Sequence, residues 1–310
     1  MKILITGGAG FIGSHLADRL LQRGDQVMVI DNYATGRRDN LSAHANLQII
    51  EGTIADQELV IQSFEQFQPD LVVHAAASYK NPDNWEEDTY TNITGTVNVL
   101  RGMKQVACDR IIYFQTALCY GVKPLAQPIQ LDHALFPANS SYAITKTAAE
   151  HFIEISGLNY VSFRLANAYG PRNISGPLPT FYQRLTQGKA CFVMDTRRDF
   201  IYIDDMIDCV MKAVEGKGKG IYHISSGKDY SIKELFDATI AALDLQLDND
   251  VEVKPRNPDD AFTILLDPKK TNAEFGWDIS TPLVEGVKRA INYYNNFGIN
   301  ETFTHLKQEN

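Results

Sequence analysis

The first half of the chain alternates short runs of apolar, β-branched residues with longer segments of helical periodicity. Strands that are apolar on both faces and separated by helical crossovers form parallel sheets covered by helices. The pattern therefore predicts an α/β fold with a doubly wound parallel sheet, whose ligands bind beyond the carboxyl ends of the strands. The predicted strands are 2–6, 26–30, 47–51, 71–74, 110–115 and 160–164, and the predicted helices include 13–23, 56–67, 91–106 and 142–155.

A glycine loop, Gly7, Gly10 and Gly13, follows the first predicted strand and opens the first predicted helix. The glycines permit a tight turn, close approach of the backbone to a pyrophosphate, and close packing of helix on strand. The start of the helix offers free N–H groups and a partial positive charge to the phosphates. In this context the pattern predicts a dinucleotide site of the Rossmann type.

Asp31 stands at the end of the second strand, where its carboxylate can accept hydrogen bonds from the adenosine ribose hydroxyls. Because its charge would repel a 2′-phosphate, NAD is favoured over NADP as the cofactor. Arg37 and Arg38 are the contrary observation, since they could serve a 2′-phosphate. In a loop of Asn, Thr and Gly, however, such arginines are more often solvated.

Tyr142 is followed four residues later by Lys146 on a predicted helix. Side chains at this spacing share a helix face, where an ammonium can favour the phenolate that a general base requires. Of the 14 tyrosines, Tyr142 alone has a Lys at this spacing. A surface pair is the alternative interpretation, but beside a dinucleotide site the pair predicts hydride chemistry with a nicotinamide cofactor.

The composition changes after about residue 166, where Pro- and Gly-rich loops replace the regular alternation. Such connections suit a smaller lobe that folds over a ligand cleft. We expect an NAD-binding Rossmann domain over 1–166 and a mainly substrate-binding α/β lobe over 167–310, with segments near 198–225 returning to the sheet. The Gly-Lys run 216–220 is predicted to be a solvated turn, with a phosphate cradle as the alternative.

Net charge and cysteine usage limit the partners. Lys+Arg 29 against Asp+Glu 38 gives −9, which disfavours non-specific binding to nucleic acid or anionic membranes. Cys108, Cys119, Cys191 and Cys209 show no CxxC spacing, so we expect free thiols in a reducing cytoplasm. No window approaches the ~18 apolar residues of a membrane span, so we expect neither a signal peptide nor a span.

These residues resemble the extended short-chain dehydrogenase/reductase family, and within it the NAD-dependent nucleotide-sugar epimerases and dehydratases. The resemblance covers almost the whole chain and is greatest to UDP-sugar 4-epimerases, including bacterial surface-polysaccharide members that share FQTALCYG. The motifs that carry it are TGGAGFIGSHL, DNYATG, VVHAAA, NITGT, FQTALCYG, YAITK, RLANAYGPR, RRDFIYIDD and EFGW.

The resemblance implies a general base at Tyr142, with Lys146 holding the nicotinamide ribose and lowering the pKa of the Tyr142 hydroxyl. Thr116 would hydrogen-bond the sugar hydroxyl that loses its proton, although it could also be an ordinary residue at a strand end. NAD would take hydride from sugar C4 and return it to the other face after the 4-keto intermediate has rotated. The cofactor would thereby be regenerated without being released.

The two positions that directly follow Thr116 distinguish the reactions of the family. The 4,6-dehydratases have an Asp-Glu pair there, whereas Ala117 and Leu118 carry no titratable group. The Glu that the decarboxylating members place in this stretch is also absent, and Cys119 is interpreted as a packed thiol rather than an acid. Epimerisation therefore leads, while a dehydratase or decarboxylase and a non-catalytic NAD-binding regulator stay open as alternatives.

In the substrate lobe, the resemblance places Asn167 on the sugar diphosphate, Arg198 on a phosphate, 190–192 beside the uracil and Asp260 on the ribose. For Arg198, an ion pair with neighbouring Asp199 is the alternative. We also expect a homodimer through helices 91–106 and 142–155, and no metal. The implied substrate contacts are Lys80, Thr116, Asn167, Leu178, Ala190, Phe192, Arg198 and Asp260. The implied cofactor contacts are Gly7, Gly10, Phe11, Ile12, Gly13, Asp31, Asn32, Thr35, Gly36, Thr53, Ile54, Ala75, Ala76, Ala77, Asn92, Tyr142, Lys146 and Leu165.

The sequence departs from the family pattern at four places. Arg256 stands one position before Asn257, where the family has a phosphate-binding Arg, so that contact is in doubt. Ala166 replaces a Phe, which could enlarge the sugar pocket or merely repack it. Thr53 replaces an Asp and weakens one adenine contact, and the turn 194–197 is shortened. The resemblance therefore implies the reaction but does not identify the sugar.

Overall fold

The computed structural model describes residues 1–138, 140–256, 260–299 and 302. The chain forms two compact units, each built from three stretches. The first unit comprises Met1–Cys119, Pro137–Arg164 and Ile207–Tyr222, and the second comprises Tyr120–Phe136, Leu165–Met206 and the described residues from His223 onward. The expected boundary lay at residue 166, with segments near 198–225 returning to the sheet. In the structure, Ile207–Tyr222 belongs to the first unit, and the second unit begins earlier than expected, with Tyr120–Phe136.

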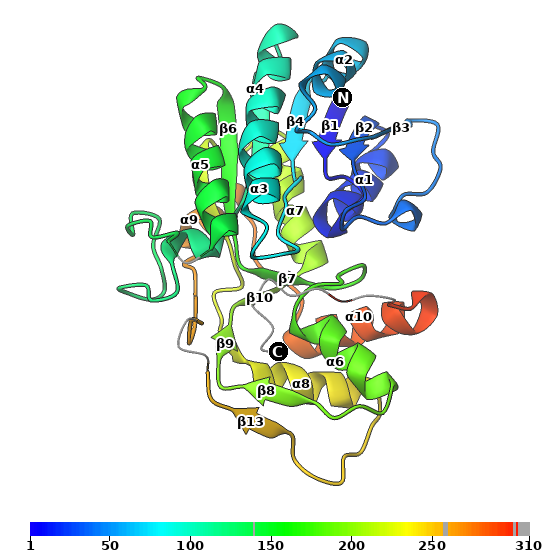
Figure 1. Cartoon of the computed structure of the whole chain (residues 1–310), viewed down its shortest axis with the longest axis vertical. Coiled ribbons are helices and arrows are strands. Elements are labelled where there is room, and N and C mark those ends of the chain that lie inside the picture. Colours follow the sequence, from blue (N-terminus) through cyan, green and yellow to red (C-terminus); the bar gives the residue numbers. More distant parts are fainter. Residues whose placement is uncertain (139, 257–259, 300–301, 303–310) are drawn as a thin grey trace. The chain divides into compact units, whose positions relative to one another are not determined.

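A seven-stranded sheet with the order β11-β6-β5-β4-β1-β2-β3 organises the first unit (Figure 1). The pairs β1–β2, β1–β4, β2–β3 and β4–β5 are parallel. This order confirms the predicted doubly wound fold, in which the strand sequence reverses direction beside β1. The strands are β1 (Lys2–Thr6), β2 (Gln26–Asp31), β3 (Leu47–Glu51), β4 (Leu71–His74), β5 (Arg110–Thr116), β6 (Asn159–Leu165) and β11 (Gly220–Ile224).

Helices cover this sheet because its central strands are apolar on both faces. Leu4, Val72 and Ile111 belong to a core that also takes in Phe64 and Val99 from the helices. The helices α2, α4 and α5 lie next to one another in this unit (Figure 1). The helices are α1 (Phe11–Arg23), η1 (Arg38–Asn40), α2 (Gln57–Phe67), α3 (Trp85–Asp88), η2 (Thr89–Thr94), α4 (Gly95–Gln105), η3 (Ala117–Tyr120), α5 (Ser141–Ile155) and α7 (Ile203–Val214).

The predicted single helix over 91–106 is divided in the structure. Its first part belongs to η2, a π-helix, and α4 follows directly. A π-turn inserts one extra residue per turn and often occurs at functional sites. Here it contains Asn92, whose side chain binds two other segments of the unit, so the widened turn serves a polar contact that hydrophobic periodicity does not report.

The second unit contains three two-stranded sheets and four helices among the described residues. The β10–β7 and β13–β8 pairs are parallel, and β12–β9 is antiparallel. A capping box at Ser231 and Glu234 begins α8. The elements are β7 (Asn167–Tyr169), α6 (Pro177–Thr186), β8 (Phe192–Met194), β9 (Arg197–Arg198), β10 (Phe200–Tyr202), β12 (Tyr230–Ser231), α8 (Ile232–Ala242), β13 (Glu252–Lys254), α9 (Lys269–Phe275) and α10 (Leu283–Phe297).

The Gly-Lys run 216–220 forms a turn between α7 and β11. Gly216, Gly218 and Gly220 all have positive φ, and Lys217 is exposed. The Arg110 guanidinium donates to the carbonyls of Lys217, at 2.7 Å, and Gly218. The turn thus presents carbonyl oxygens to a cation, which accords with the predicted solvated turn.

Candidate active site

The glycine loop between β1 and α1 leaves no room for side chains at two positions. Gly7 has φ +68°, and a Cβ added to it would lie 2.7 Å from the Ala76 backbone after β4. A Cβ on Gly13 would lie 2.3 Å from the Gly7 carbonyl oxygen. Gly10 is the N-cap of α1 and supplies no side-chain cap. The close packing and the uncapped helix start fit a bound pyrophosphate.

Asp31 lies under this loop at the carboxyl end of β2. Its carboxylate accepts hydrogen bonds from the backbone N–H groups of Ala9 and Tyr33, both at 2.8 Å. Burial raises the pKa of the Asp31 carboxyl, while these hydrogen bonds act in the opposite direction. Its position at the strand end is the one expected of a residue that binds the adenosine ribose.

The two arginines after Asp31 are paired with carboxylates on the surface. Arg37 pairs with Asp39, and Arg38 pairs with Glu51, at 2.5 Å in each case. The Arg38 guanidinium also lies 4.1 Å from the centroid of the Tyr33 ring. Both cations therefore already have anionic partners, which favours their interpretation as solvated ion pairs.

Lys146 is buried one turn after Tyr142 on α5. Its ammonium lies 4.0 Å from the centroid of the Tyr113 ring, and the Tyr113 hydroxyl donates to the Lys146 carbonyl at 3.0 Å. Burial lowers the pKa of Lys146 to about 7, and the charge of Glu150, one turn further, opposes this effect. The ammonium is thus buried against Tyr113 of β5, with a pKa close to neutral pH, where a bound ligand that changes this pKa would change its charge.

The pKa of the Tyr142 hydroxyl lies well above its usual range. Burial is the largest cause, followed by Tyr79 and Asp88; the Tyr79 ring makes an edge contact with a centroid distance of 6.2 Å. Desolvation of the phenolate dominates this shift, and the expectation that Lys146 lowers this pKa stays a prediction. Oxidised nicotinamide would add a positive charge that acts in the other direction.

Thr116 ends β5, the strand that packs against α5. Its hydroxyl accepts a hydrogen bond from Leu118 N–H at 3.2 Å, and its N–H donates to the Gln115 side-chain oxygen at 2.7 Å. Cys119 is buried in the following 3₁₀ turn, and burial raises the pKa of its thiol to about 12. The thiol is thus inert at neutral pH, as expected for a packed cysteine.

Asn92 fastens α5 to the segment that follows β4. Its side chain exchanges two hydrogen bonds with the Ser78 backbone, at 2.9 and 3.1 Å, and donates to the Thr145 hydroxyl at 3.0 Å. The segment that it holds begins with Ala75–Ala77, which the sequence places beside the cofactor. Asn92 therefore sets the distance between this segment and the helix that carries Tyr142 and Lys146.

In the second unit, Arg198 forms an ion pair with Asp260, in which Nη2 donates to both carboxylate oxygens, at 2.8 and 2.9 Å. Arg198 also donates to the Ala261 carbonyl at 3.0 Å, and Arg256 donates to the Asp260 carbonyl at 2.7 Å. The partner of Arg198 is thus Asp260, while the adjacent Asp199 is buried and bound by Ser225 and Ser226. The two residues predicted to touch phosphate and ribose are therefore brought together.

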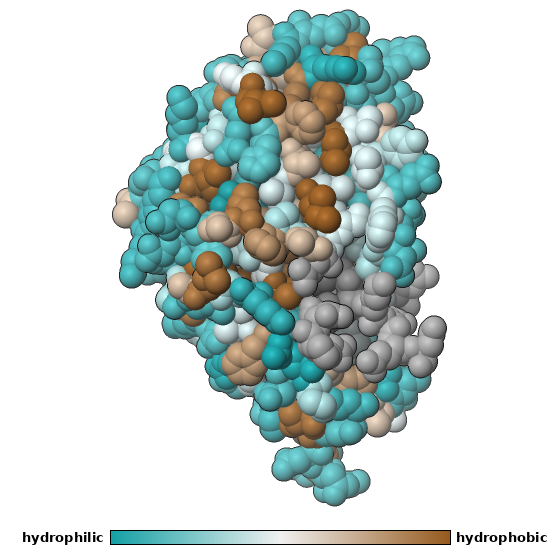
Figure 2. Space-filling view, turned by 60° about the vertical axis from the view of Figure 1, so that its left-hand side comes forward, coloured by the Kyte–Doolittle hydropathy of each residue, from teal (hydrophilic) through white to brown (hydrophobic). Residues whose placement is uncertain are grey.

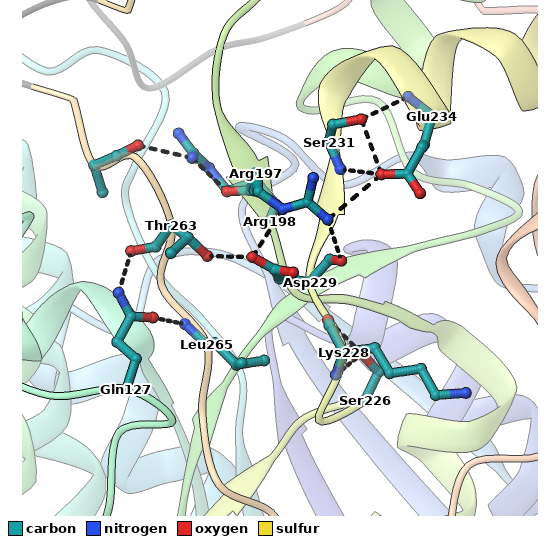
Figure 3. Close-up of polar contacts among 11 residues, drawn as sticks. Gln127, Arg197, Arg198, Ser226, Lys228, Asp229, Ser231, Glu234, Thr263 and Leu265 are labelled. Carbon is teal, nitrogen blue, oxygen red and sulfur yellow. Dashed lines mark hydrogen bonds and ion pairs between the residues drawn. The ribbon is translucent and has the colours of Figure 1, made fainter.

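A network of polar side chains supports this arginine. Figure 3 shows Arg197 beside Arg198, with the Arg197 guanidinium bound to Asp229 at 2.9 Å. Thr263 also donates to Asp229, at 3.3 Å, and its carbonyl accepts from the Gln127 amide at 3.0 Å. The network joins β9 to the segment before α9 and to the stretch Tyr120–Phe136.

The other predicted substrate contacts lie at separate places. Within the second unit, Asn167 is exposed and donates to the Asp199 carbonyl, and Leu178 is buried in α6. Ala190 is exposed, and its carbonyl accepts from Arg184. Phe192 is 43% exposed, and the Lys254 ammonium lies 4.1 Å from its ring centroid. Lys80 is exposed in the first unit. Asn257, at the departure beside Arg256, lies outside the described residues.

The described residues offer neither a metal-binding cluster nor a membrane-spanning helix. No group of three or more His, Cys, Asp or Glu residues in the described part of the chain could hold a metal ion. Among the same residues, no helix combines the length and the apolar character needed to cross a membrane.

The profile of the "NAD dependent epimerase/dehydratase family" matches residues 3–225. The chain belongs to this family. The structure of WbmH from Bordetella bronchiseptica in complex with NAD+ is 54% identical, with a TM-score of 0.93 over 96% of this chain and 99% of that one. WbmG from the same organism, in complex with NAD and UDP, is 42% identical, with a TM-score of 0.91 over 99% of both chains. A putative UDP-glucose 4-epimerase of Methanocaldococcus jannaschii is 29% identical over 95% of this chain and 98% of that protein.

Three buried polar residues of this family member were not predicted as site residues. His74, Asp88 and Gln115 are each 1% exposed and lie in the unit that carries Tyr142. In the described part of the chain, one Asp88 carboxylate oxygen and the Gln115 amide nitrogen have no hydrogen-bond partner. A polar residue inside an apolar run is the signal that could have marked His74 and Gln115, whereas Asp88 follows two exposed glutamates and carries no such signal.

Proposed function

We propose that this member of the NAD dependent epimerase/dehydratase family epimerises C4 of a UDP-linked hexose, N-acetylhexosamine or uronate through a transient 4-keto intermediate. One observation carries the proposal: Tyr142 and Lys146 share a helix turn against β5, and the residues after Thr116 are apolar. The sequence similarity to WbmG, whose crystals contain NAD and UDP, supports the nucleotide.

The first unit would hold the cofactor, which when bound accepts a hydride from C4 and returns it. The glycine loop, with the start of α1, would bind its pyrophosphate, Asp31 the adenosine ribose, and Lys146 the nicotinamide ribose. The further residues that we assign to the cofactor are Asn32, Thr35, Gly36, Thr53, Ile54, Ala75–Ala77, Asn92 and Leu165.

Tyr142 would move the proton. Its phenolate oxygen takes the proton from the C4 hydroxyl during oxidation and gives it back to the keto oxygen during reduction, with Thr116 holding that oxygen in place. A phenol with a raised pKa is a poor base, so the ammonium of Lys146 and the charge of the oxidised cofactor must lower it. The same raised pKa keeps the proton on Tyr142 between the two steps, until hydride returns to C4 and the developing alkoxide takes it up.

Dehydration and decarboxylation each need a further acid or base near C5. Ala117 and Leu118 offer none, and the Cys119 thiol, with its pKa raised to about 12 by burial, does not ionise at neutral pH. Epimerisation needs only the proton held by Tyr142. The dehydratase and decarboxylase alternatives would give a lasting 4-keto sugar or a pentose as their product.

In the second unit, Arg198 would hold a phosphate and Asp260 the uridine ribose. Because the Arg198 Nη2 atom donates to both Asp260 carboxylate oxygens, at 2.8 and 2.9 Å, a carboxylate already orients the guanidinium. A bound diphosphate would share the Arg198 guanidinium with Asp260 or displace Asp260 from it. Asn167 would contact the diphosphate and Phe192 the uracil.

The central experiment is the Tyr142→Phe variant, assayed with a panel of UDP-hexoses, UDP-N-acetylhexosamines and UDP-uronates by NMR of the C4 epimers. We expect the wild type to interconvert one epimer pair and to copurify with NAD. The variant should keep NAD and lose turnover by at least ~100-fold, the size of a general-base contribution. Substantial epimerisation by the variant, or net loss of water or carbon dioxide, would refute the proposal.

We further propose a homodimer that works in the cytoplasm in bacterial surface-polysaccharide synthesis. Ile144, Phe152 and Ile155 on α5 are 48%, 39% and 79% exposed, and Tyr90 in η2 is 52% exposed. The side of the molecule brought forward in Figure 2 carries apolar residues among hydrophilic ones. Apolar side chains gathered on one helix favour a partner surface.

A further inference from the structure

Asp199 lies between the two residues of the second unit that we assign to the diphosphate. It directly follows Arg198 in the chain. Its carbonyl accepts hydrogen bonds from the Asn167 backbone N–H, at 2.9 Å, and from the Asn167 side-chain amide, at 3.3 Å. Asp199 is thus joined to one proposed phosphate contact by a peptide bond and to the other by two hydrogen bonds.

The side chain of Asp199 is held by two other segments of the same unit. The residue is 0% exposed. Its Oδ1 atom accepts from the backbone N–H and the hydroxyl of Ser226, at 2.9 and 2.7 Å. Its Oδ2 atom accepts from the Ser225 hydroxyl at 2.5 Å and from the Leu266 N–H at 3.4 Å. Because a buried carboxylate without such donors would be costly, the carboxylate and its donors fix one another.

The charge of Asp199 also orients both serine hydroxyls. Each hydroxyl has one proton and a second acceptor within reach, the Leu266 carbonyl at 3.0 Å for Ser225 and the Lys228 carbonyl at 3.1 Å for Ser226 (Figure 3). In each case the carboxylate oxygen is nearer, and a hydrogen bond to an ion is stronger than one to a carbonyl. The protons therefore point to Asp199, which organises the connection between β11 and β12.

This connection leads into the strand that pairs with Arg198. Tyr230 of β12 stands opposite Arg198 of β9, and the Arg197 guanidinium donates to the Asp229 carbonyl at 2.9 Å. The backbone from which Arg198 extends is thus fixed by its own neighbour Asp199 and by the strand that Asp199 helps to place. A shift of ~1 Å in such a group is enough to weaken a directed contact to a ligand.

We propose that Asp199 is a positioning residue for a nucleoside diphosphate: its buried carboxylate fixes the backbone from which Arg198 and Asn167 reach the phosphates, and it does not touch the ligand. The inference rests on the function proposed above and deepens it. Recognition of the diphosphate depends on Asp199, whereas recognition of the nucleoside, hydride transfer and proton transfer do not.

The isosteric variant Asp199→Asn tests the inference. In either orientation its new N–H2 group faces a backbone N–H, that of Ser226 or that of Leu266, so the arrangement cannot be kept. In ligand-observed NMR titrations, UDP should bind about tenfold more weakly than to the wild type, the loss of part of a charge-assisted contact. Uridine, which has no phosphate, should bind equally to both proteins. In turnover, KM for the UDP-sugar should rise while kcat stays close to that of the wild type.

Asp205→Asn is the matched control. Asp205 is 3% exposed in the same unit, and its carboxylate accepts from Ser280 and from the Thr281 N–H. In the described part of the chain it makes no hydrogen bond to Arg198 or Asn167. Its replacement should lower stability against urea to a similar extent, yet it should leave the ratio of UDP to uridine affinity unchanged.

Ser226→Ala removes one hydroxyl donor and keeps the backbone N–H, so it should weaken UDP binding less than Asp199→Asn does. If Asp199→Asn does not fold, this milder variant decides the test, and unchanged UDP affinity in it would overturn the inference. In folded Asp199→Asn, wild-type affinity for UDP, or an equal loss for UDP and uridine, would also overturn it. The same loss of UDP affinity in Asp205→Asn would do so as well.

The proposed function and the inference fail in different ways. A wild type that binds UDP but epimerises no UDP-sugar would contradict the proposed function, while the UDP and uridine titrations would still test Asp199. A wild type that binds no UDP would overturn both.

Discussion

Replacement of His74 by Gln should change how the stability of the protein depends on pH. The His74 ring lies between the hydroxyls of Thr6, at 2.6 Å, and Thr96, at 2.9 Å. Thr96 donates to the Asn92 carbonyl at 2.6 Å, and the Ala76 N–H donates to Thr6 at 3.2 Å. Because Thr96 gives its proton to the Asn92 carbonyl, its oxygen must accept from Nε2–H of His74; in the neutral ring, Nδ1 then accepts from the Thr6 hydroxyl.

Burial lowers the pKa of His74 to about 3, and the nearby Lys146 adds to the effect. An unfolded chain has an ordinary histidine pKa of ~6.5. The unfolded state therefore takes up a proton that the native state does not as the pH falls below about 6.5, and the free energy of unfolding declines. Linkage over the interval from about pH 7.5 to 4.5 gives a loss of about 2.5 kcal/mol for this one group, which His74→Gln removes.

The assay is urea unfolding of the wild type and His74→Gln at a series of pH values in that interval. The variant should be less stable at pH 7.5, because two hydrogen bonds are altered. As the pH falls, however, its free energy of unfolding should decline less steeply than that of the wild type, by up to about 1.4 kcal/mol per pH unit, the slope that one proton contributes. Histidine NMR should independently report the Nε2–H tautomer. If the free energy of unfolding fell equally steeply with pH in the two proteins, the reasoning would be refuted, because His74 would then have an ordinary pKa in the folded protein.

Two further predictions concern the glycine loop and the helix surface. Gly13→Ala places a Cβ 2.3 Å from the Gly7 carbonyl oxygen, so the variant should lose about 1–3 kcal/mol of stability together with its bound NAD. In Gly10→Ala the Cβ stays 3.2 Å from that oxygen, so this control should lose NAD with a smaller change in stability. Gly13→Ala protein that unfolds like the wild type and contains as much NAD would contradict the clash. Light scattering should show that Ile155→Glu is a monomer, whereas Leu125→Glu, which changes a residue that is 89% exposed in the second unit, should remain a dimer. A dimeric Ile155→Glu would contradict the proposed interface.

The sheet could be predicted from the sequence because local composition determines it. The strands β1, β3 and β4 begin and end where their β-branched runs do, and the others differ by a residue or so at their ends. Helices that their own periodicity reveals bury the runs of β1 and β4, while β3 is an edge strand with partly exposed side chains. The fold class follows from this repeated local signal, which needs no knowledge of distant contacts.

The polar details of the site could not be predicted in this way. The π-turn at Asn92 has the same apolar spacing as an ordinary helix, so only its contacts with Ser78 and Thr145 identify it. The Arg198–Asp260 pair joins residues 62 positions apart, and proximity of Asp199 in sequence suggested the wrong partner as the alternative. Such contacts depend on how separate segments meet, which the periodicity of each segment does not contain.

The return of residues 207–222 to the first unit also limits how such proteins can be rearranged. Arg110 on β5 is bound by the carbonyls of Ala213, Lys217 and Gly218, and β11 lies next to β6 in the sheet. A fragment that stops near residue 166 would lose these acceptors and leave β6 as an open edge. Exchange of substrate lobes between relatives by a single crossover would therefore break the cofactor domain, so recombination that preserves the fold must exchange at least two separate stretches of the gene.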